Sequence, residues 1–184
     1  MPVRHCQKSA KLPTVWLMTD ERMDDTSLMC ALNRLPRGAG VVFRHYSLAA
    51  KQRRALFDQV RATARRRKLV LLLAGSASTA RAWKADGWHG RTWGPSNMLH
   101  SAPVHSVPEL RKAAQVDACL LFVSPVFATR SHPGARVLGR IGFARLAQRA
   151  SSPTVALGGM THARWRGLRN AGAYGWAAIS AWAS

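Results

Sequence analysis

Short runs of aliphatic residues recur along this chain and alternate with stretches that carry apolar residues at helical spacing. The runs are apolar at nearly every position, which is typical of strands buried on both faces. The pattern predicts strands at 15–18, 40–44, 69–73, 88–90, 98–104, 118–123, 154–157 and 175–179. It predicts helices at 26–35, 49–67, 75–84, 106–114, 141–150 and 161–171, the first of them capped by Thr26 or Ser27.

The alternation of strand and helix indicates parallel β/α units and therefore an α/β fold. Eight strands predict a compact (β/α)8 TIM-type barrel, shorter than the roughly 200–250 residues usual for that fold. Residues 181–184 are too few for an eighth helix, so we expect a truncated C-terminal helix and a bare strip of barrel wall. A homo-oligomer or the N-terminal segment would cover that strip. An open doubly wound sheet is the alternative, although no G-x-G-x-x-G follows the first strand.

Composition adds an unusual charge to this picture. Lys and Arg number 28 against 8 acidic residues, for a net charge of +20. Such a field attracts nucleic acid, anionic membranes or phosphorylated ligands, although scattered basic residues also fit an ordinary solvated surface. We divide the chain into a basic tail, 1–13, and a single barrel domain, 14–184.

Targeting and redox signals favour a cytoplasmic protein. No apolar run approaches the roughly 20 residues that span a bilayer, and the N-terminus lacks the apolar stretch of a secretory signal. Cys6, Cys30 and Cys119 have no CxxC spacing. They fit free thiols in a reducing compartment better than a disulfide framework or a zinc site.

The clearest candidate site follows the last two predicted strands. The run 154–157 ends in Gly158 and Gly159, just before Thr161 can cap a helix. Bare backbone N–H groups beside a helix start favour an anion, and the loops after the last two strands of such barrels often bind phosphate. We therefore expect Gly158, Gly159, Ile179 and Ser180 to bind phosphate. A tight turn with a close strand–helix contact would also explain the glycines.

Five segments, in order along nearly the whole chain, resemble the motifs of one family. They are Val-Trp-Leu-Met-Thr-Asp at 15–20, Ala-Asp-Gly-Trp-His-Gly at 85–90, Ser-Pro-Val-Phe-Ala-Thr at 124–129, Ala-Leu-Gly-Gly-Met-Thr at 156–161 and Ala-Gly-Ala-Tyr-Gly-Trp-Ala-Ala-Ile-Ser at 171–180. The chain resembles the thiamine phosphate synthase family with its TenI relatives, as a diverged member.

The resemblance implies a role in thiamine biosynthesis and a phosphorylated small-molecule ligand, either thiazole phosphate or thiamine phosphate. The synthase joins an aminopyrimidine diphosphate to a thiazole phosphate, with Mg²⁺ holding the diphosphate, whereas TenI relatives include a thiazole tautomerase. By matching motifs, Thr129, Ser131 and His89 are candidate substrate-binding residues. Arg44 is retained, and His132 stands where the family has Lys, so both are candidate catalytic residues.

Other parts of the family pattern are missing. The Asn-Asp pair expected after the third strand is Ala74-Gly75, and segment 90–94 carries no Asp. Mg²⁺ is therefore expected for the family but lacks its ligands here, and we name no metal ligand. Arg44, Arg91, Arg130 and His132 could form a metal-free cationic clamp. Whether the chain is an enzyme stays open, because a degenerate barrel that only binds a phosphorylated ligand, or a basic nucleic-acid-binding protein, would share these features.

Overall fold

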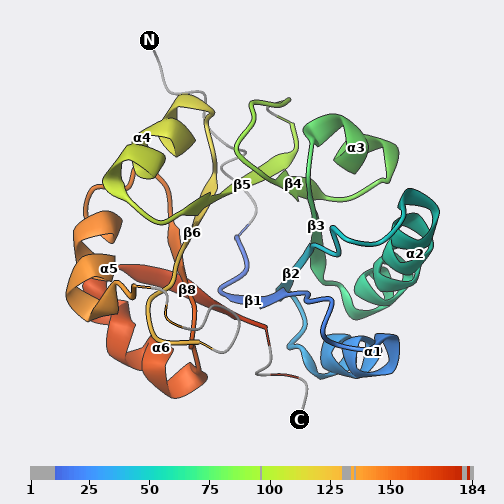
Figure 1. Cartoon of the computed structure of the whole chain (residues 1–184), viewed down its shortest axis with the longest axis horizontal. Coiled ribbons are helices and arrows are strands. Elements are labelled where there is room, and N and C mark those ends of the chain that lie inside the picture. Colours follow the sequence, from blue (N-terminus) through green and yellow to red (C-terminus); the bar gives the residue numbers. More distant parts are fainter. Residues whose placement is uncertain (1–10, 96, 130–133, 135, 180–181, 183–184) are drawn as a thin grey trace.

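The computed structural model describes residues 11–95, 97–129, 134, 136–179 and 182, and in them eight parallel strands close into a barrel (Figure 1). The strands follow one another around the barrel in sequence order. They are β1 (Val15–Met18), β2 (Gly40–Phe43), β3 (Val70–Ala74), β4 (Gly87–His89), β5 (Leu99–Val104), β6 (Leu120–Val123), β7 (Thr154–Leu157) and β8 (Ala173–Ala178). The predicted barrel is confirmed.

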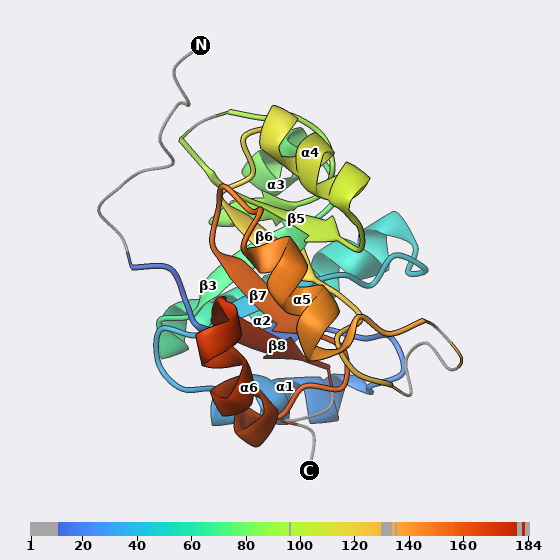
Figure 2. The same ribbon diagram turned by 90° about the vertical axis from the view of Figure 1, so that its left-hand side faces the viewer.

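Helices lie outside the barrel between successive strands, as Figures 1 and 2 show from two directions. They are α1 (Asp25–Arg34), α2 (Ala50–Arg67), α3 (Ala77–Ala82), α4 (Val107–Gln115), α5 (Gly139–Ala147) and α6 (His162–Leu168), which continues into the 3-10 turn η1 (Arg169–Ala171). Within the described residues β4 and β5 are joined without a helix. The cap predicted for the first helix is wrong, because the side chain of Asp24 accepts the Ser27 N–H and the helix begins at Asp25.

Two layers of apolar side chains hold the barrel together. One fills its interior and includes Trp16, Val42, Leu72 and Phe122, whereas two outer clusters fill the space between strands and helices. Gly40 faces Trp16 across the β1–β2 ladder, and a Cβ at Gly40 would lie 2.2 Å from the indole ring. The indole ring of Trp16 therefore fits into the barrel only because position 40 of the neighbouring strand is a glycine.

The last described residue, Trp182, packs on the barrel wall that was predicted to be bare. Trp182 stacks on Trp176 of β8, with ring centroids 5.4 Å apart, and packs against both outer clusters. One residue thus covers part of the wall that a helix after β8 would cover. The expected homo-oligomer stays a prediction, and residues 180, 181, 183 and 184 lie outside the described residues.

The cysteines differ from the prediction of three free thiols. Cys30 is free and exposed, but Cys119 is disulfide-bonded, so the prediction is wrong for Cys119. None of the helices in the described ranges has both the length and the apolar character needed to cross a membrane.

Candidate active site

The carboxyl ends of the eight parallel strands meet at one rim of the barrel, where this fold carries its chemistry. Thr19, Arg44, His89 and Gly158 each follow or end a strand there. The rim divides into three sectors with different chemistry, at β1–β2, at β4–β6 and at β7–β8.

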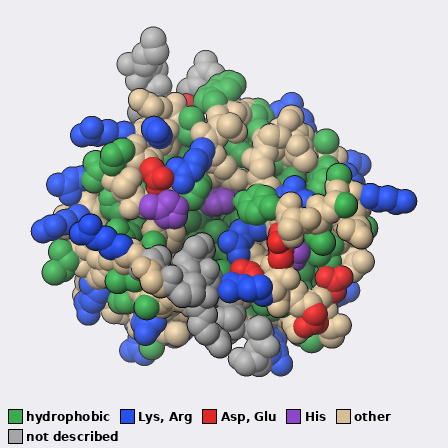
Figure 3. Space-filling model, viewed as in Figure 1, with side chains coloured by type: hydrophobic (Ala, Val, Ile, Leu, Met, Phe, Trp, Pro, Cys, Tyr) green, Lys and Arg blue, Asp and Glu red, His purple; other side chains and the backbone are tan. Residues whose placement is uncertain are grey.

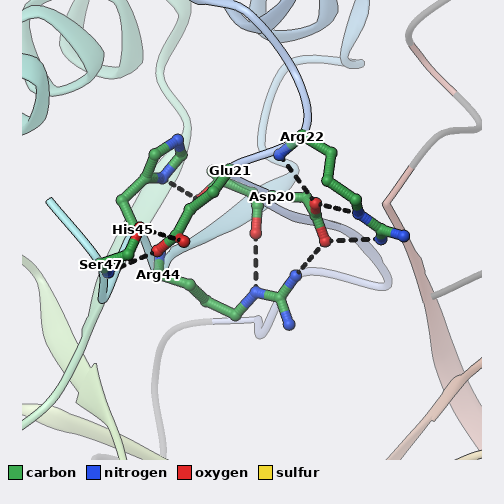
Figure 4. A network of polar contacts seen from close by, with 7 residues as sticks. Asp20, Glu21, Arg22, Arg44, His45 and Ser47 are labelled. Atoms are coloured by element: carbon green, nitrogen blue, oxygen red, sulfur yellow. Dashed lines mark hydrogen bonds and ion pairs between the residues drawn. The ribbon is translucent and has the colours of Figure 1, made fainter. Parts of the chain in front are cut away.

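The β1–β2 sector is a pocket of about 590 Å³ whose charged groups are paired with one another (Figure 4). The Arg44 Nη2 lies 2.9 Å from the Asp20 carboxylate, and its Nε donates to the Thr19 carbonyl at 2.7 Å. The same carboxylate accepts from Arg22. The hydrogen bond from Arg22 lowers the pKa of Asp20 from 3.8 to about 2, against the opposing effect of burial, and both arginine charges add to this. Arg44 therefore enters the pocket with part of its charge already compensated.

His45 and Glu21 complete this pocket through hydrogen bonds of their own. The imidazole of His45 is buried, lies 3.0 Å from the Thr19 hydroxyl through Nδ1, and stacks on Phe43. Burial lowers the pKa of His45 below its ordinary value. Glu21 accepts from the backbone N–H and the hydroxyl of Ser47, joining the loops after β1 and β2. The pocket therefore has few polar groups left to meet a highly charged ligand.

In the β4–β6 sector, His89 is built into the barrel interior. Its side chain is only 6% exposed, Nδ1 lies 2.9 Å from the Ser101 hydroxyl, and the ring meets Phe122 edge-on. Burial lowers the pKa of His89 from 6.5 to about 3, and the positive charge of Arg44 acts in the same direction. This surrounding supports a neutral packing residue better than a group that meets substrate.

His105 lies in the same sector, directly after β5, and unlike His89 it is exposed. Its Nδ1 lies 2.7 Å from the Ser124 carbonyl, which can only accept, so Nδ1 carries the proton and Nε2 is the basic nitrogen. Glu109 accepts from the His105 backbone N–H and from Arg91. Arg91, one member of the suggested cationic clamp, is thus paired with a carboxylate.

The β7–β8 sector is organised by backbone instead of side chains. Gly158 and Gly159 both have positive φ, 94° and 59°, which favours glycine at each position. A Cβ at Gly159 would lie 2.4 Å from the Ala128 carbonyl oxygen. Within the described residues, no hydrogen bond is made by the backbone N–H of either glycine. Pairing of Leu157 with Ala177 sets this turn beside Ile179 at the end of β8.

The loop after β6 lies along the same turn. Val126 N–H donates to the Leu157 carbonyl and Phe127 N–H to the Gly158 carbonyl, so the loop extends the β6–β7 pairing past the ends of the strands. Arg164 of α6 donates to the Gly159 carbonyl and lies over the Phe127 ring. Thr129 follows in this loop, partly buried, which puts its segment next to the Gly158–Gly159 turn. The predicted site residues Ser131, His132 and Ser180, and Arg130 of the suggested clamp, lie outside the described residues.

Comparison with known proteins identifies the family of this chain. The family model described as thiamine monophosphate synthase matches residues 15–182. The chain belongs to the thiamine monophosphate synthase family. It is 29% identical over 181 residues to the putative thiamine-phosphate synthase 2 of Aquifex aeolicus, covering 92% of this chain and 97% of that one. It is 30% identical over 156 residues to the thiamine-phosphate synthase of Chloroflexus aurantiacus, covering 78% and 72% of the two chains.

A solved structure agrees with the family. The thiamine phosphate pyrophosphorylase of Pyrococcus furiosus superposes with a TM-score of 0.75 at 25% identity, over 92% of this chain and 86% of that one. A glycerol uptake operon antiterminator regulatory protein of Listeria monocytogenes superposes with a TM-score of 0.64 at 11% identity, which reflects the shared fold alone.

The residues present do not fit the Mg²⁺ that the family resemblance implies. Among the described residues no three His, Cys, Asp or Glu side chains lie close enough to hold a metal ion. The three carboxylates that ring the mouth, Asp20, Glu21 and Glu109, accept hydrogen bonds from protein groups. Each of these carboxylates is therefore engaged within the fold.

The Asp20–Arg44 ion pair is the main feature of the rim that sequence reasoning missed. The two residues are 24 positions apart, and their contact follows from the pairing of Met18 with Val42 in the β1–β2 ladder. Because Asp20 and Arg44 each follow the end of one of these strands, the parallel register carries enough information to predict the pair. His105 was also missed, since only the position of the Ser124 carbonyl makes it an oriented base.

Proposed function

We propose that this chain acts in thiamine biosynthesis and binds a phosphorylated thiazole compound, thiazole phosphate or thiamine phosphate, with its phosphate at the ends of β7 and β8. Family membership over residues 15–182 supports the pathway. The geometry of the Gly158–Gly159 turn supports the position of the phosphate. The phosphate-binding residues in this proposal are Gly158, Gly159, Ile179 and Ser180.

One observation carries the proposal: two consecutive glycines at positive φ leave their N–H groups without an acceptor among the described residues. An oxyanion accepts such N–H groups well, because they are fixed before it arrives and cost little reorganisation. Arg164 adds a cation that is anchored to the Gly159 carbonyl. These features support a monophosphate, which needs one compact set of donors.

The neighbouring β1–β2 sector gives less support to the synthase reaction with a metal-held diphosphate. Its principal cation, Arg44, is compensated by Asp20, and the carboxylates of the mouth are engaged. The proposal therefore favours processing of a thiazole phosphate, or transfer without the family's metal ligands. In either case His132 or the oriented His105 is the candidate group for moving a proton.

Two measurements on the purified protein test the proposal. Calorimetry with thiamine phosphate should show binding that is lost in Gly159→Asp and kept in Gly167→Ala. Gly167 is a matched control because a Cβ there meets only Arg140, at an ordinary 3.9 Å. Incubation with aminopyrimidine diphosphate and thiazole phosphate, followed by detection of thiamine phosphate, then tests for the transferase.

The outcomes separate the alternatives. Binding together with product formation establishes a transferase, whereas binding with interconversion of thiazole phosphate tautomers establishes a tautomerase. Binding without either reaction leaves the ligand-binding barrel. Equal affinity of the wild type and Gly159→Asp for thiamine phosphate would contradict the proposed phosphate position.

A further inference from the structure

The C-terminal third of the chain carries positive charge without any acidic residue. Residues 118–184 contain eight Arg, no Lys and no Asp or Glu, whereas all eight acidic residues lie between positions 20 and 117. Compositional drift toward arginine would raise the charge everywhere. It would not by itself remove every acid from one continuous part of the molecule.

The fold gathers the arginines of α5, α6 and their described flanks on one side of the barrel. α5 and α6 lie next to each other on the outside, as both views show (Figures 1 and 2), and Arg140 of α5 donates to the Gly167 carbonyl of α6 at 2.9 Å. The exposed arginines on these helices and their flanks form a surface that we call the arginine face. It consists of Arg136, Arg140, Arg145, Arg149, Arg166 and Arg169, whereas Arg164 belongs to the proposed phosphate site.

The charges of the arginine face are not paired within the described part of the chain. The ion pairs found there all lie elsewhere, at Asp20, at Asp58 and at Glu109. On α2, by contrast, Asp58 pairs with both Arg54 and Arg61. The space-filling view shows the same division, with most acidic atoms gathered on the side of α1 and α2 (Figure 3).

The kind of partner follows from the balance of the arginine face, on which six exposed arginines stand beside two exposed apolar side chains. A membrane surface or a protein interface would need an exposed apolar area beside the charges. The apolar side chains Phe143 and Leu146 of α5 are buried against the barrel, and Ile141 and Val137 are the two large exposed hydrophobics of this side among the described residues. Polyanions are bound by phosphate contacts alone, without an apolar centre.

Duplex nucleic acid fits this face better than a single strand. Binding of single strands relies on exposed aromatic rings on which bases stack. The large exposed aromatics of the described residues are Tyr46 and Trp93, and neither lies on α5 or α6. A duplex offers closely spaced phosphates, and the guanidinium group binds phosphate in a bidentate manner.

We propose that the arginine face binds the phosphate backbone of double-stranded nucleic acid without reading its sequence. This activity is independent of the thiamine site, because the face lies outside the barrel and the proposed ligand site lies at the strand ends. The binding is electrostatic, so it weakens steeply as salt rises.

Fluorescence anisotropy with labelled duplex DNA of mixed sequence tests the proposal over a range of salt concentrations. The face variant is Arg145→Glu, Arg149→Glu and Arg166→Glu combined. The matched control combines Lys51→Glu, Arg65→Glu and Arg66→Glu on α2. It also replaces three exposed cations by three anions, so both variants have the same net charge. We expect the face variant to bind at least tenfold more weakly at low salt, and the control to change less than threefold.

The salt dependence of duplex binding is a second measurement that tests the proposal. The slope of log K against log salt should fall by about 2 to 3 in the face variant, because each lost phosphate contact removes about 0.9. A triple Gln variant at the same three positions, with the circular dichroism spectrum of the wild type, guards against an effect of misfolding. Equal weakening by both Glu triples, no binding of duplex DNA, or binding to phosphatidylserine vesicles alone would each overturn the proposal.

Discussion

Two neighbouring sectors of the rim, β7–β8 and β1–β2, differ in how their charged and polar groups are paired. At β7–β8 the backbone N–H groups of Gly158 and Gly159 have no acceptor among the described residues. The turn is held in place by hydrogen bonds to its carbonyl groups, from Phe127 to Gly158 and from Arg164 to Gly159. At β1–β2 the cation Arg44 is bound to Asp20, and Glu21 is bound to Ser47. In the proposed function the β7–β8 sector binds an anion from a ligand, whereas in the β1–β2 sector the anion beside Arg44 is the protein's own Asp20.

Under the proposed function, this barrel keeps an anion site in one sector while the cation of the neighbouring sector is held by a carboxylate of the protein itself. Ion pairing inside the protein and ligand binding compete for the same guanidinium. The absence of the expected metal carboxylates and the Asp20–Arg44 pair would act in the same direction, against a metal-held diphosphate.

The largest expected effect is at the glycine turn. Gly159→Asp places a Cβ against the Ala128 carbonyl and an anion where the phosphate is proposed to lie. We expect thiamine phosphate to bind at least about 100-fold more weakly, which corresponds to about 2.7 kcal/mol. Calorimetry measures this, with Gly167→Ala as the control that keeps wild-type affinity. A Gly159→Asp variant that binds like the wild type would remove the distinction between the two sectors.

The second effect is a pH dependence of stability that arises from His89. Its pKa is about 3 in the folded protein and about 6.5 in the unfolded chain, so the unfolded chain binds the extra proton as the pH falls below 6.5. Folding stability should therefore fall by up to about 1.4 kcal/mol per pH unit, or about 2 kcal/mol between pH 6.5 and pH 5. Urea unfolding at several pH values measures the slope.

The control for this effect is His89→Gln, which has no titrating ring and should flatten that part of the profile. If wild type and His89→Gln show the same profile, His89 is accessible to water and could meet substrate.

A smaller effect is expected from releasing Arg44. Asp20→Asn removes the carboxylate that Arg44 and Arg22 share and leaves two cations beside the pocket. We expect inorganic pyrophosphate to bind about tenfold more tightly, about 1.4 kcal/mol, as measured by calorimetry. Asp58→Asn is the control, because Asp58 pairs with Arg54 and Arg61 on α2 and is not among the pocket residues, so it should leave pyrophosphate affinity unchanged. Unchanged affinity in Asp20→Asn would show that Asp20 does not limit this sector.

The last effect is the acid dependence of the stability that the same pair provides. The pKa of Asp20 lies at about 2 instead of 3.8, so its contribution to stability is complete above about pH 4 and is lost as the pH falls toward 2. The difference in unfolding free energy between wild type and Asp20→Asn should be about 1–2 kcal/mol at pH 5, decrease as the pH falls toward 2, and vanish below pH 2. A difference that does not change with pH would mean that the ion pair adds nothing to stability.

The fold was predictable from the sequence because its strands are aliphatic runs with clear ends. Thr154–Leu157 was predicted without error, since an apolar run between Pro153 and Gly158 leaves little freedom. The first helix cap was misplaced because Asp24, Thr26 and Ser27 can all accept the N–H groups of a helix start.

The site was predictable only in part, because its chemistry depends on contacts between distant residues. The glycine turn was expected from its own sequence, whereas the burial of His89 against Phe122 and the Asp20–Arg44 pair arise from barrel closure. The disulfide at Cys119 shows the same limit, since cysteine spacing alone favoured free thiols.

The most direct test of the account compares thiamine phosphate binding by the wild-type protein in EDTA and in Mg²⁺. Because the phosphate is proposed to rest on backbone N–H groups, and the carboxylates of the mouth are engaged, the account predicts the same dissociation constant in both conditions. Binding that appears only with Mg²⁺ would contradict it.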